Sequence, residues 1–221
     1  MDSSKRQSKR VIANERLSET GYLLRLERGD FKFRAGELIS LYGAGPLDVR
    51  DYTVASGEGD STIDVLYRLM PAGILTRQLI GLKPGDTIDL SGPYGRFTVR
   101  DKKVPMVFIA TGTGIAPCHA FAASYPELEL TVLHGCATSE DLFYREALSR
   151  YNYFPCVSGQ VVEGFRGRVT RRLERLELDV SAHYYLCGAN EMIYEVQDLL
   201  AEYGVHEKQI FTEPYYYRAD D

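Results

Sequence analysis

The pattern of hydrophobic residues changes near Asp101, and this change constrains the fold more than any other feature of the sequence. Before Asp101, short runs of strand-forming residues alternate with turn-forming segments such as Gly57-Glu58-Gly59-Asp60. Strands are predicted over residues 10–16, 21–27, 37–42, 50–56, 62–69 and 86–90, and a helix is predicted over residues 73–82. Short strands at this spacing favour a small antiparallel β-barrel over residues 1–101.

After Asp101 the chain alternates strands with helices. Residues 104–110 form a continuous apolar run, which is typical of a central parallel strand buried on both faces. Further strands are predicted over residues 128–135, 153–158, 182–188 and 209–212, with helices over 115–124, 141–150, 170–176 and 191–203. This alternation predicts a doubly wound α/β parallel sheet over residues 102–221, so that the chain has two domains.

Composition excludes several classes of protein. The 221 residues carry a net charge of −5, which argues against nucleic-acid binding by bulk electrostatics. No apolar run approaches the ~20 residues that span a bilayer, and the start of the chain lacks the apolar stretch of a secretory signal. A cytoplasmic protein is therefore expected. Cys118, Cys136, Cys156 and Cys187 are too far apart for a zinc or iron–sulfur spacing, so no metal is predicted.

Arg50-Asp51-Tyr52-Thr53 is a candidate ligand-binding stretch within a predicted strand. Because a strand has period two, Arg50 and Tyr52 project to one face and Thr53 to the other. A guanidinium grips phosphate and a ring stacks on a flat group, and a flavin dinucleotide has both. The same four residues are equally compatible with an ordinary half-buried strand.

A second candidate follows in Leu66-Tyr67-Arg68 and the segment 71–76. Gly73 precedes a predicted helix start and Thr76 lies in its first turn, where free backbone amides and a hydroxyl would bind an anion. Taken alone, the segment is as readily a capped helix. Taken with Arg50, a shared phosphate is the favoured interpretation.

Residues 111–114 (Thr-Gly-Thr-Gly) follow a buried strand and open a helix, so a phosphate would be able to approach their backbone. Pro117 stands where the full dinucleotide fingerprint has a third glycine. The second strand ends at His134-Gly135 without an acid for a ribose hydroxyl. The glycine spacing alone is therefore an incomplete signal.

Cys187-Gly188 lies at a strand end before a helix that contains Met192. Ligands bind beyond the carboxyl ends of parallel strands, so this thiol would be able to contact a nicotinamide; the alternative is a buried structural cysteine. Near the C-terminus, Glu213 precedes tyrosines that would pack at a sheet edge, form an interface or stack on a flavin.

Histidine and arginine patterns complete the survey. The histidines show no metal-ligand spacing and are interpreted as structural or surface residues; they are His119, His134, His183 and His206. A basic run is interpreted as a solvated helix face, or as a surface for an acidic partner or a phosphate. Its members are Arg166, Arg168, Arg171, Arg172 and Arg175.

With these motifs in order, the chain resembles the ferredoxin–NADP⁺ reductase family along nearly its full length. Arg50-x-Tyr52-Thr53 is similar to the family's flavin motif and Gly73-x-x-Thr76 to its second pyrophosphate site. Residues 91–95 (Ser-Gly-Pro-Tyr-Gly) resemble the turn that ends its barrel, and residues 112–117 its nicotinamide-dinucleotide loop. Cys187-Gly188 with Met192, and Glu213 with Tyr215, resemble its segments near the nicotinamide.

The resemblance implies a flavoenzyme that uses FAD and NADP or NAD. It implies that Arg50 and Thr76 hold the FAD pyrophosphate, that Tyr52 packs on one flavin face and Thr53 bonds near its N5, and that Tyr215 or Tyr216 covers the other face. The implied catalytic residues are Thr53, Cys187 and Glu213. The implied cofactor-binding residues are Arg50, Tyr52, Thr53, Val54, Tyr67, Arg68, Gly73, Ile74, Leu75, Thr76, Thr111, Gly112, Thr113, Gly114, Pro117, Arg168, Cys187, Gly188, Met192 and Tyr215.

The implied activity is hydride transfer between NAD(P)H and flavin and single-electron transfer between flavin and ferredoxin or flavodoxin. Alternatives are the reductase component of an oxygenase system, a free flavin or quinone reductase, or a non-catalytic FAD-holding electron-transfer subunit. The chain has Ala137 and Gly159 where many relatives have arginines for the extra phosphate of NADP. Arg166 or Arg168 would compensate, so the choice between NADPH and NADH stays open.

Overall fold

The computed structural model describes residues 5–45, 48–161 and 163–215. These residues form two compact units. The first unit holds the described residues up to Val99 together with Ala116–Ser124. The second holds Arg100–Ile115 and residues 125–215.

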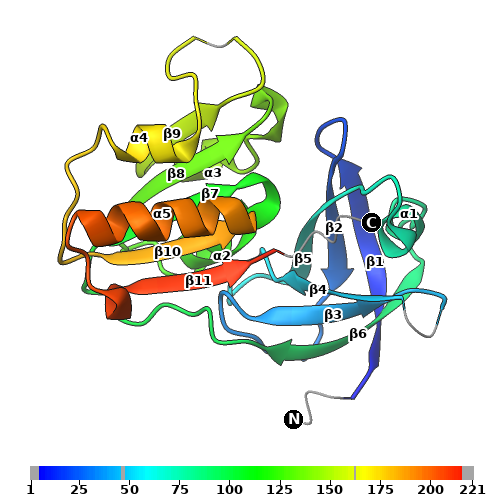
Figure 1. Cartoon of the computed structure of the whole chain (residues 1–221). Coiled ribbons are helices and arrows are strands. Elements are labelled where there is room, and N and C mark those ends of the chain that lie inside the picture. The colour runs from blue at the N-terminus through cyan, green and yellow to red at the C-terminus, as the bar shows by residue number, and fades with distance from the viewer. Residues whose placement is uncertain (1–4, 46–47, 162, 216–221) are drawn as a thin grey trace. The chain divides into compact units, whose positions relative to one another are not determined.

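Antiparallel strands form the six-stranded sheet of the first unit (Figure 1). They are β1 (Gln7–Arg16), β2 (Gly21–Glu27), β3 (Leu38–Tyr42), β4 (Val49–Thr53), β5 (Thr62–Arg68) and β6 (Thr87–Tyr94), in the order β4-β3-β6-β1-β2-β5. The edge strands β4 and β5 also meet, because the Ala55 amide beyond β4 donates to the Asp64 carbonyl of β5 over 2.8 Å. This confirms the predicted antiparallel β architecture.

Alternate residues of the strands form the core of the first unit, as the period of two requires. Leu24 and Leu26 of β2 and Ile63 and Val65 of β5 are fully buried. The helix α1 (Ile74–Leu79) adds Leu79 to the same core. The amphipathic strands of the sequence thus bury one face around a single apolar cluster.

Several elements of the first unit differ from the predicted ones in their bounds; β1 begins at Gln7 and β4 ends at Thr53. The strand β6 continues to Tyr94, beyond the predicted end at residue 90, because Ser91 pairs with Ser40 and Tyr94 with Leu38 across an irregularity in the ladder. The helix α1 ends at Leu79 rather than at residue 82, since the Gly81 amide already bonds to the Gln78 carbonyl in a turn.

The helix α2 (Ala116–Ser124) packs within the first unit. Its His119 ring nitrogen Nδ1 lies 2.7 Å from the Ala55 carbonyl, and its Ser124 hydroxyl accepts from the Glu58 amide over 2.9 Å. The helix therefore follows the second unit's loop in sequence but makes these contacts with the segment between β4 and β5 of the first.

Five parallel strands form the sheet of the second unit. They are β7 (Met106–Thr111), β8 (Leu130–Cys136), β9 (Asn152–Val157), β10 (His183–Gly188) and β11 (Ile210–Pro214), in the order β11-β10-β7-β8-β9. The helices α4 (Val169–Leu173) and α5 (Asn190–Glu202) pack on this sheet (Figure 1). Ile109, Leu133 and Leu186 of three strands lie in one core with Val196 and Leu200 of α5. The predicted α/β parallel sheet is confirmed.

The region 139–150 departs from the single predicted helix. It contains a 3₁₀ turn, η2 (Ser139–Asp141), and a four-residue helix, α3 (Arg145–Leu148). Tyr144 between them has φ of +58°, a left-handed conformation that a continuous right-handed helix cannot contain.

The helices of the described ranges are too short or too polar to cross a membrane.

Candidate functional site

One candidate binding region lies on β4 of the first unit. Tyr52 pairs with Ile39 and its ring packs half-buried against the core, whereas Arg50 is exposed. The Arg50 guanidinium donates to the Val49 carbonyl over 2.8 Å. Thr53 is 2% exposed. The strand therefore presents a charged group and an aromatic ring, as the alternation predicts.

The helix α1 lies beside the loop that leads into β4. Its Gln78 side-chain oxygen accepts from the Ala44 amide over 2.8 Å, and its side-chain nitrogen donates to Asp48 over 3.2 Å. The two predicted phosphate-binding segments, near Arg50 and at Gly73, thus belong to neighbouring elements. Arg68 at the end of β5 is exposed and adds a second cation to the set.

Thr76 binds its own loop in this structure. Its hydroxyl accepts from the Met70 amide over 3.2 Å. A Cβ on Gly73 would lie 2.7 Å from that hydroxyl oxygen, so a glycine is required for the loop to close on the helix. The Thr76 hydroxyl therefore shapes the segment before α1.

Three other predicted residues of the first unit are core residues. The Tyr67 ring is 1% exposed, stacks on Tyr22 and donates its hydroxyl to Asn14 over 3.1 Å. Burial raises the pKa of the Tyr67 hydroxyl, which stays protonated. Val54 and Leu75 also lie in the apolar cluster, while Ile74 is 57% exposed. Because the side chains of Tyr67, Val54 and Leu75 are buried, a ligand would contact these residues through their backbone groups.

A separate candidate binding region lies at the carboxyl edge of the parallel sheet in the second unit. The strand β7 ends at Thr111 and leads into the 3₁₀ turn η1 (Gly112–Ile115). The Thr111 hydroxyl accepts from the Ala189 amide over 3.0 Å. A Cβ on Gly114 would lie 2.4 Å from the Cys187 carbonyl oxygen. Only a glycine at 114 allows this loop to approach the end of β10 so closely.

The end of β10 joins the loop to the C-terminal strand. Cys187 pairs with Glu213 of β11, and the Tyr215 amide donates to the Gly188 carbonyl over 2.8 Å. Gly188 has φ of +130°, and a Cβ there would lie 2.2 Å from the Thr111 hydroxyl oxygen. The predicted residues of β7, β10 and β11 are therefore brought together at one edge.

The predicted residues at and near this edge differ in how far their side chains are exposed. Cys187 is fully buried, Met192 and Thr113 are each 6% exposed, and Glu213 is half-buried. Pro117 is buried at the start of α2. Tyr215 is half-buried, and Tyr216, the alternative covering ring, lies outside the described residues.

Comparisons with known proteins agree with this arrangement. Residues 9–99 match the oxidoreductase FAD-binding domain and residues 108–198 the oxidoreductase NAD-binding domain. The chain is 31% identical to ferredoxin–NADP reductase B of Sorangium cellulosum, over 93% of this chain and 96% of that protein. It belongs to the ferredoxin–NADP reductase family.

The chain is also similar to an oxygenase electron transfer component and to a solved reductase structure. The toluate 1,2-dioxygenase electron transfer component of Pseudomonas putida is 28% identical over 93% of this chain, which spans 66% of that relative's length. A crystal structure of a ferredoxin NADP⁺ reductase from Neisseria gonorrhoeae with bound FAD and NADP shares the fold. It has a TM-score of 0.85 at 20% identity, over 96% of this chain and 99% of that one.

The residues of this reductase-family chain fit the two cofactors of its domains, FAD and a nicotinamide dinucleotide. Arg50 and Arg68 are exposed cations and Tyr52 carries a half-buried ring, and these are the kinds of group that a pyrophosphate and a flat ring system would require. In the second unit, a Cβ on Gly112 would meet no atom of the described residues within 4 Å. That side of the loop therefore has room for a ligand against its backbone.

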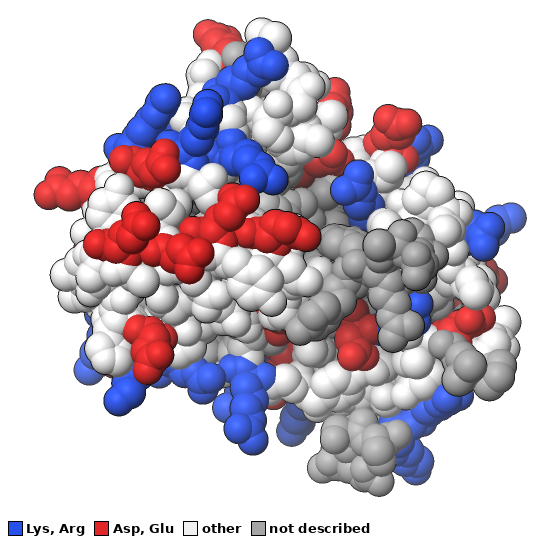
Figure 2. All heavy atoms as spheres, viewed as in Figure 1, with Lys and Arg blue, Asp and Glu red and all other residues white. Residues whose placement is uncertain are grey.

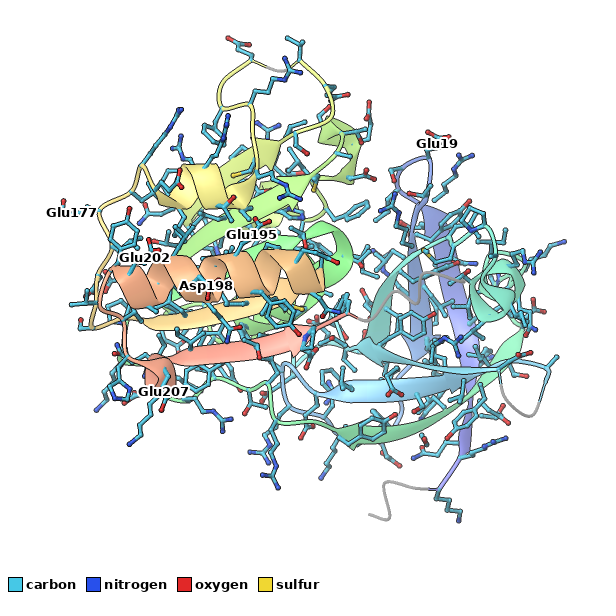
Figure 3. The ribbon with its side chains drawn as sticks, in the orientation of Figure 1. Glu19, Glu177, Glu195, Asp198, Glu202 and Glu207 are labelled. Carbon is cyan, nitrogen blue, oxygen red and sulfur yellow. The ribbon has the colours of Figure 1, made fainter. Side chains whose placement is uncertain are left out.

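The basic run of the second unit lies beside an acidic helix. Figure 2 shows acids gathered over α5 and Lys or Arg side chains above them, and Figure 3 shows Glu195, Asp198 and Glu202 along that helix. Arg168 donates to Glu195 over 2.9 Å. Arg172 stacks over the Phe154 ring at 4.6 Å. If Arg168 binds a cofactor phosphate, as predicted, that phosphate has to compete with Glu195 for the guanidinium.

His134 is the site-related residue that sequence reasoning missed. It is fully buried near the end of β8, and its Nε2 lies 3.0 Å from the Gly112 carbonyl oxygen. Burial lowers the pKa of His134 to about 4, although the Gly112 carbonyl and Asp141 act in the opposite sense. The imidazole is therefore neutral near pH 7. Its partner lies in a different strand–loop unit of the sequence, so no local motif reveals the contact.

Proposed function

We propose that the chain is an FAD-dependent oxidoreductase that moves electrons between NAD(P)H and a small protein carrier, ferredoxin or flavodoxin. The observation that carries the proposal is the meeting of the Thr111–Gly114 loop, Cys187 and Glu213 at the carboxyl edge of the parallel sheet. In parallel α/β sheets this edge is where ligands bind. The preceding FAD-binding domain supplies the second redox partner.

The residues of the first unit bind and orient the flavin nucleotide in this proposal. The Arg50 guanidinium offers a charge-assisted contact to the pyrophosphate, with Arg68 as a second cation. The Tyr52 ring offers a flat apolar face to the isoalloxazine. Thr53 is buried at the end of β4 and offers a hydroxyl for a hydrogen bond to the flavin. The Thr76 hydroxyl acts indirectly, because it holds the loop that precedes α1.

The residues of the second unit bind and position the nicotinamide nucleotide. Bound together, the two cofactors supply two-electron transfer from the nicotinamide and one-electron transfer from the flavin. Gly112 leaves open space for the dinucleotide against the backbone, while Gly114 and Gly188 allow the loop to pack on the end of β10. Cys187 is fully buried near the end of β10, and its carbonyl oxygen lies against Gly114 of the loop. Half-buried Glu213 offers a carboxylate beside it.

Anaerobic titration of the purified protein with NADH and NADPH, followed by the flavin absorbance near 450 nm, tests the proposal. Bleaching by either nucleotide supports an enzyme. A yellow protein that neither nucleotide bleaches would instead be the non-catalytic FAD-holding subunit. Reduced protein is then mixed with ferredoxin, flavodoxin or free FMN. Rapid transfer to a protein carrier supports the favoured function, whereas transfer to free FMN alone supports a flavin reductase.

The reductase component of an oxygenase system is the second candidate, because the toluate dioxygenase electron transfer component is among the relatives. The chain spans 66% of that protein's length. Its four cysteines form no iron–sulfur spacing, so an iron–sulfur centre in the electron path would lie outside these 221 residues. Both candidates therefore require a carrier that these residues do not contain.

We further infer that NADH is the preferred donor. The loops after β8 and β9 are joined tightly, since the Gly159 amide donates to the Ala137 carbonyl over 2.9 Å. The side-chain amide of Gln160 donates to the Ser139 hydroxyl over 2.7 Å. These groups are neutral, and exposed Glu140 stands next to Ser139. A 2′-phosphate favours a positive fork, so this surface suits a ribose hydroxyl better.

A further inference from the structure

A buried polar cluster lies beneath the dinucleotide loop of the second unit. His134 and Cys136 project from the same face of β8 because they are two residues apart. The His134 ring nitrogen Nδ1 lies 3.1 Å from the Tyr153 hydroxyl of β9, and Nε2 lies 3.0 Å from the Gly112 carbonyl oxygen. The Cys136 thiol donates to the Asp141 carbonyl over 3.0 Å. The imidazole thus joins three segments of chain.

The partners of the ring determine its tautomer. A carbonyl oxygen only accepts, so Nε2 carries the proton and donates to Gly112. Nδ1 is then an acceptor, and the Tyr153 hydroxyl donates a hydrogen bond to it. The Cys136 sulfur, 3.3 Å from Nε2, lies on the donor side of the ring. A neutral imidazole with one defined donor is therefore directed at the loop.

The Gly112 peptide opens the 3₁₀ turn η1, and Gly112 has no side chain that would help to hold its orientation. Gly112 has φ of +54° and, as a glycine, meets little steric resistance to rotation. Its carbonyl belongs to the peptide that also carries the Thr113 amide. In a trans peptide the carbonyl and the amide hydrogen point in opposite directions. A carbonyl held toward His134 therefore turns the Thr113 amide away from the buried cluster.

We propose that His134 is a positioning residue that holds the Gly112–Thr113 peptide in the orientation that binds the nicotinamide dinucleotide. The proposal rests on the function proposed above, because it takes the loop as the dinucleotide site. Tyr153 supports the role by keeping Nδ1 an acceptor, so that the donor stays on Nε2. Removal of the donor frees the peptide to rotate, and the dinucleotide then has to reorder it.

Two substitutions separate the donor from the bulk of the ring. His134→Leu removes the donor and keeps an apolar side chain in the buried space. His134→Gln keeps an N–H group near the position of Nε2. Val132→Ala is the matched control, since Val132 is fully buried on the same face of β8 two residues earlier. All are prepared as full-length protein loaded with FAD.

The measurement is the dissociation constant of NAD⁺, obtained by isothermal titration calorimetry, alongside the thermal midpoint. His134→Leu is expected to raise the dissociation constant about tenfold, the scale of one lost hydrogen bond. His134→Gln is expected to stay within about threefold of the wild type. Val132→Ala is expected to lower the thermal midpoint and leave the dissociation constant unchanged. Tyr153→Phe, which removes the hydroxyl that bonds to Nδ1, is expected to weaken binding less than His134→Leu and serves if the leucine variant does not fold.

The outcomes are distinguishable. Wild-type affinity in His134→Leu, with the thermal midpoint lowered as in Val132→Ala, would show that His134 is only a packing residue. Equal weakening in the leucine and glutamine variants would show that the donor is not what matters. A wild-type protein that binds neither NAD⁺ nor NADP⁺ would refute the proposed function and with it the role of His134.

Discussion

The protonation of His134 predicts a specific loss of stability in mild acid. The pKa falls from 6.5 in an unfolded chain to about 4 in the fold, chiefly because the ring is fully buried. The folded protein is therefore more stable with a neutral His134 ring than with a protonated one. At about 1.4 kcal/mol per pKa unit, the difference corresponds to about 3 kcal/mol of folding free energy.

The sign follows from proton binding by the two states. Between pH 6.5 and about 4 the unfolded chain holds more protons at this residue than the folded chain does. The free energy of unfolding therefore falls as the pH is lowered through this window, and this contribution levels off below it. At pH 7 the ring is neutral in both states, so the full stability is present there.

The assay compares the wild type with His134→Gln, which cannot titrate at this position. Urea unfolding of the FAD-loaded protein is followed by circular dichroism at pH 7 and near pH 4. Because the chain forms two units, two transitions are fitted, and the one that NAD⁺ shifts at pH 7 is assigned to the second unit. The wild type is expected to lose about 3 kcal/mol more than the variant between the two pH values.

The comparison cancels the carboxylates and the other histidines, which both proteins share. Val132→Ala retains His134 and is expected to show the wild-type pH dependence at a lower stability. If His134→Gln lost as much stability in acid as the wild type, the buried neutral imidazole would not be the cause, and the donor geometry assigned to it would be wrong.

Three further changes test other parts of the site. Arg50→Ala is expected to weaken FAD retention by roughly 1.5–3 kcal/mol, the scale of a charge-assisted hydrogen bond; full retention after gel filtration would remove Arg50 from the flavin site. Gly114→Ala places a Cβ 2.4 Å from the Cys187 carbonyl oxygen. It should therefore destabilise the second unit by about 1–3 kcal/mol and weaken NAD⁺ binding. An unchanged dissociation constant would contradict this close packing. Ala137→Arg should improve binding of NADP⁺ relative to NAD⁺ by about tenfold if the loop after β8 faces the ribose, since one charge-assisted contact is added; an unchanged ratio would count against that assignment.

Much of the fold was predictable because its signals are local. The continuous apolar run before Thr111 indicated a central parallel strand, and β7 lies in the middle of the sheet. The strand β2 has the bounds predicted from its alternation. The predicted helix over residues 141–150 was wrong in extent, because the left-handed conformation of Tyr144 depends on the packing around it and leaves no trace in residue spacing.

The site was predictable to the extent that glycines mark it. Gly114 and Gly188 are visible in the sequence, and the structure gives each a close contact that no other residue permits. Thr76 was assigned to a phosphate from its place in a first helical turn, yet its hydroxyl accepts from the Met70 amide. That bond depends on how the preceding loop folds back, which residue types alone do not determine.

His134 shows why the supporting residues of such a loop escape a search by motif. A glycine is required by the backbone at its own position, so its reason is local. The requirement for His134 arises from a carbonyl that lies 22 residues earlier in the chain and from a hydroxyl on the next strand. Only the pairing of β7, β8 and β9 brings the three together. Transfer of residues 111–117 to another member of the family would therefore not carry the loop's geometry with it, unless the residue at the end of the second strand also presents a donor to the first glycine's carbonyl.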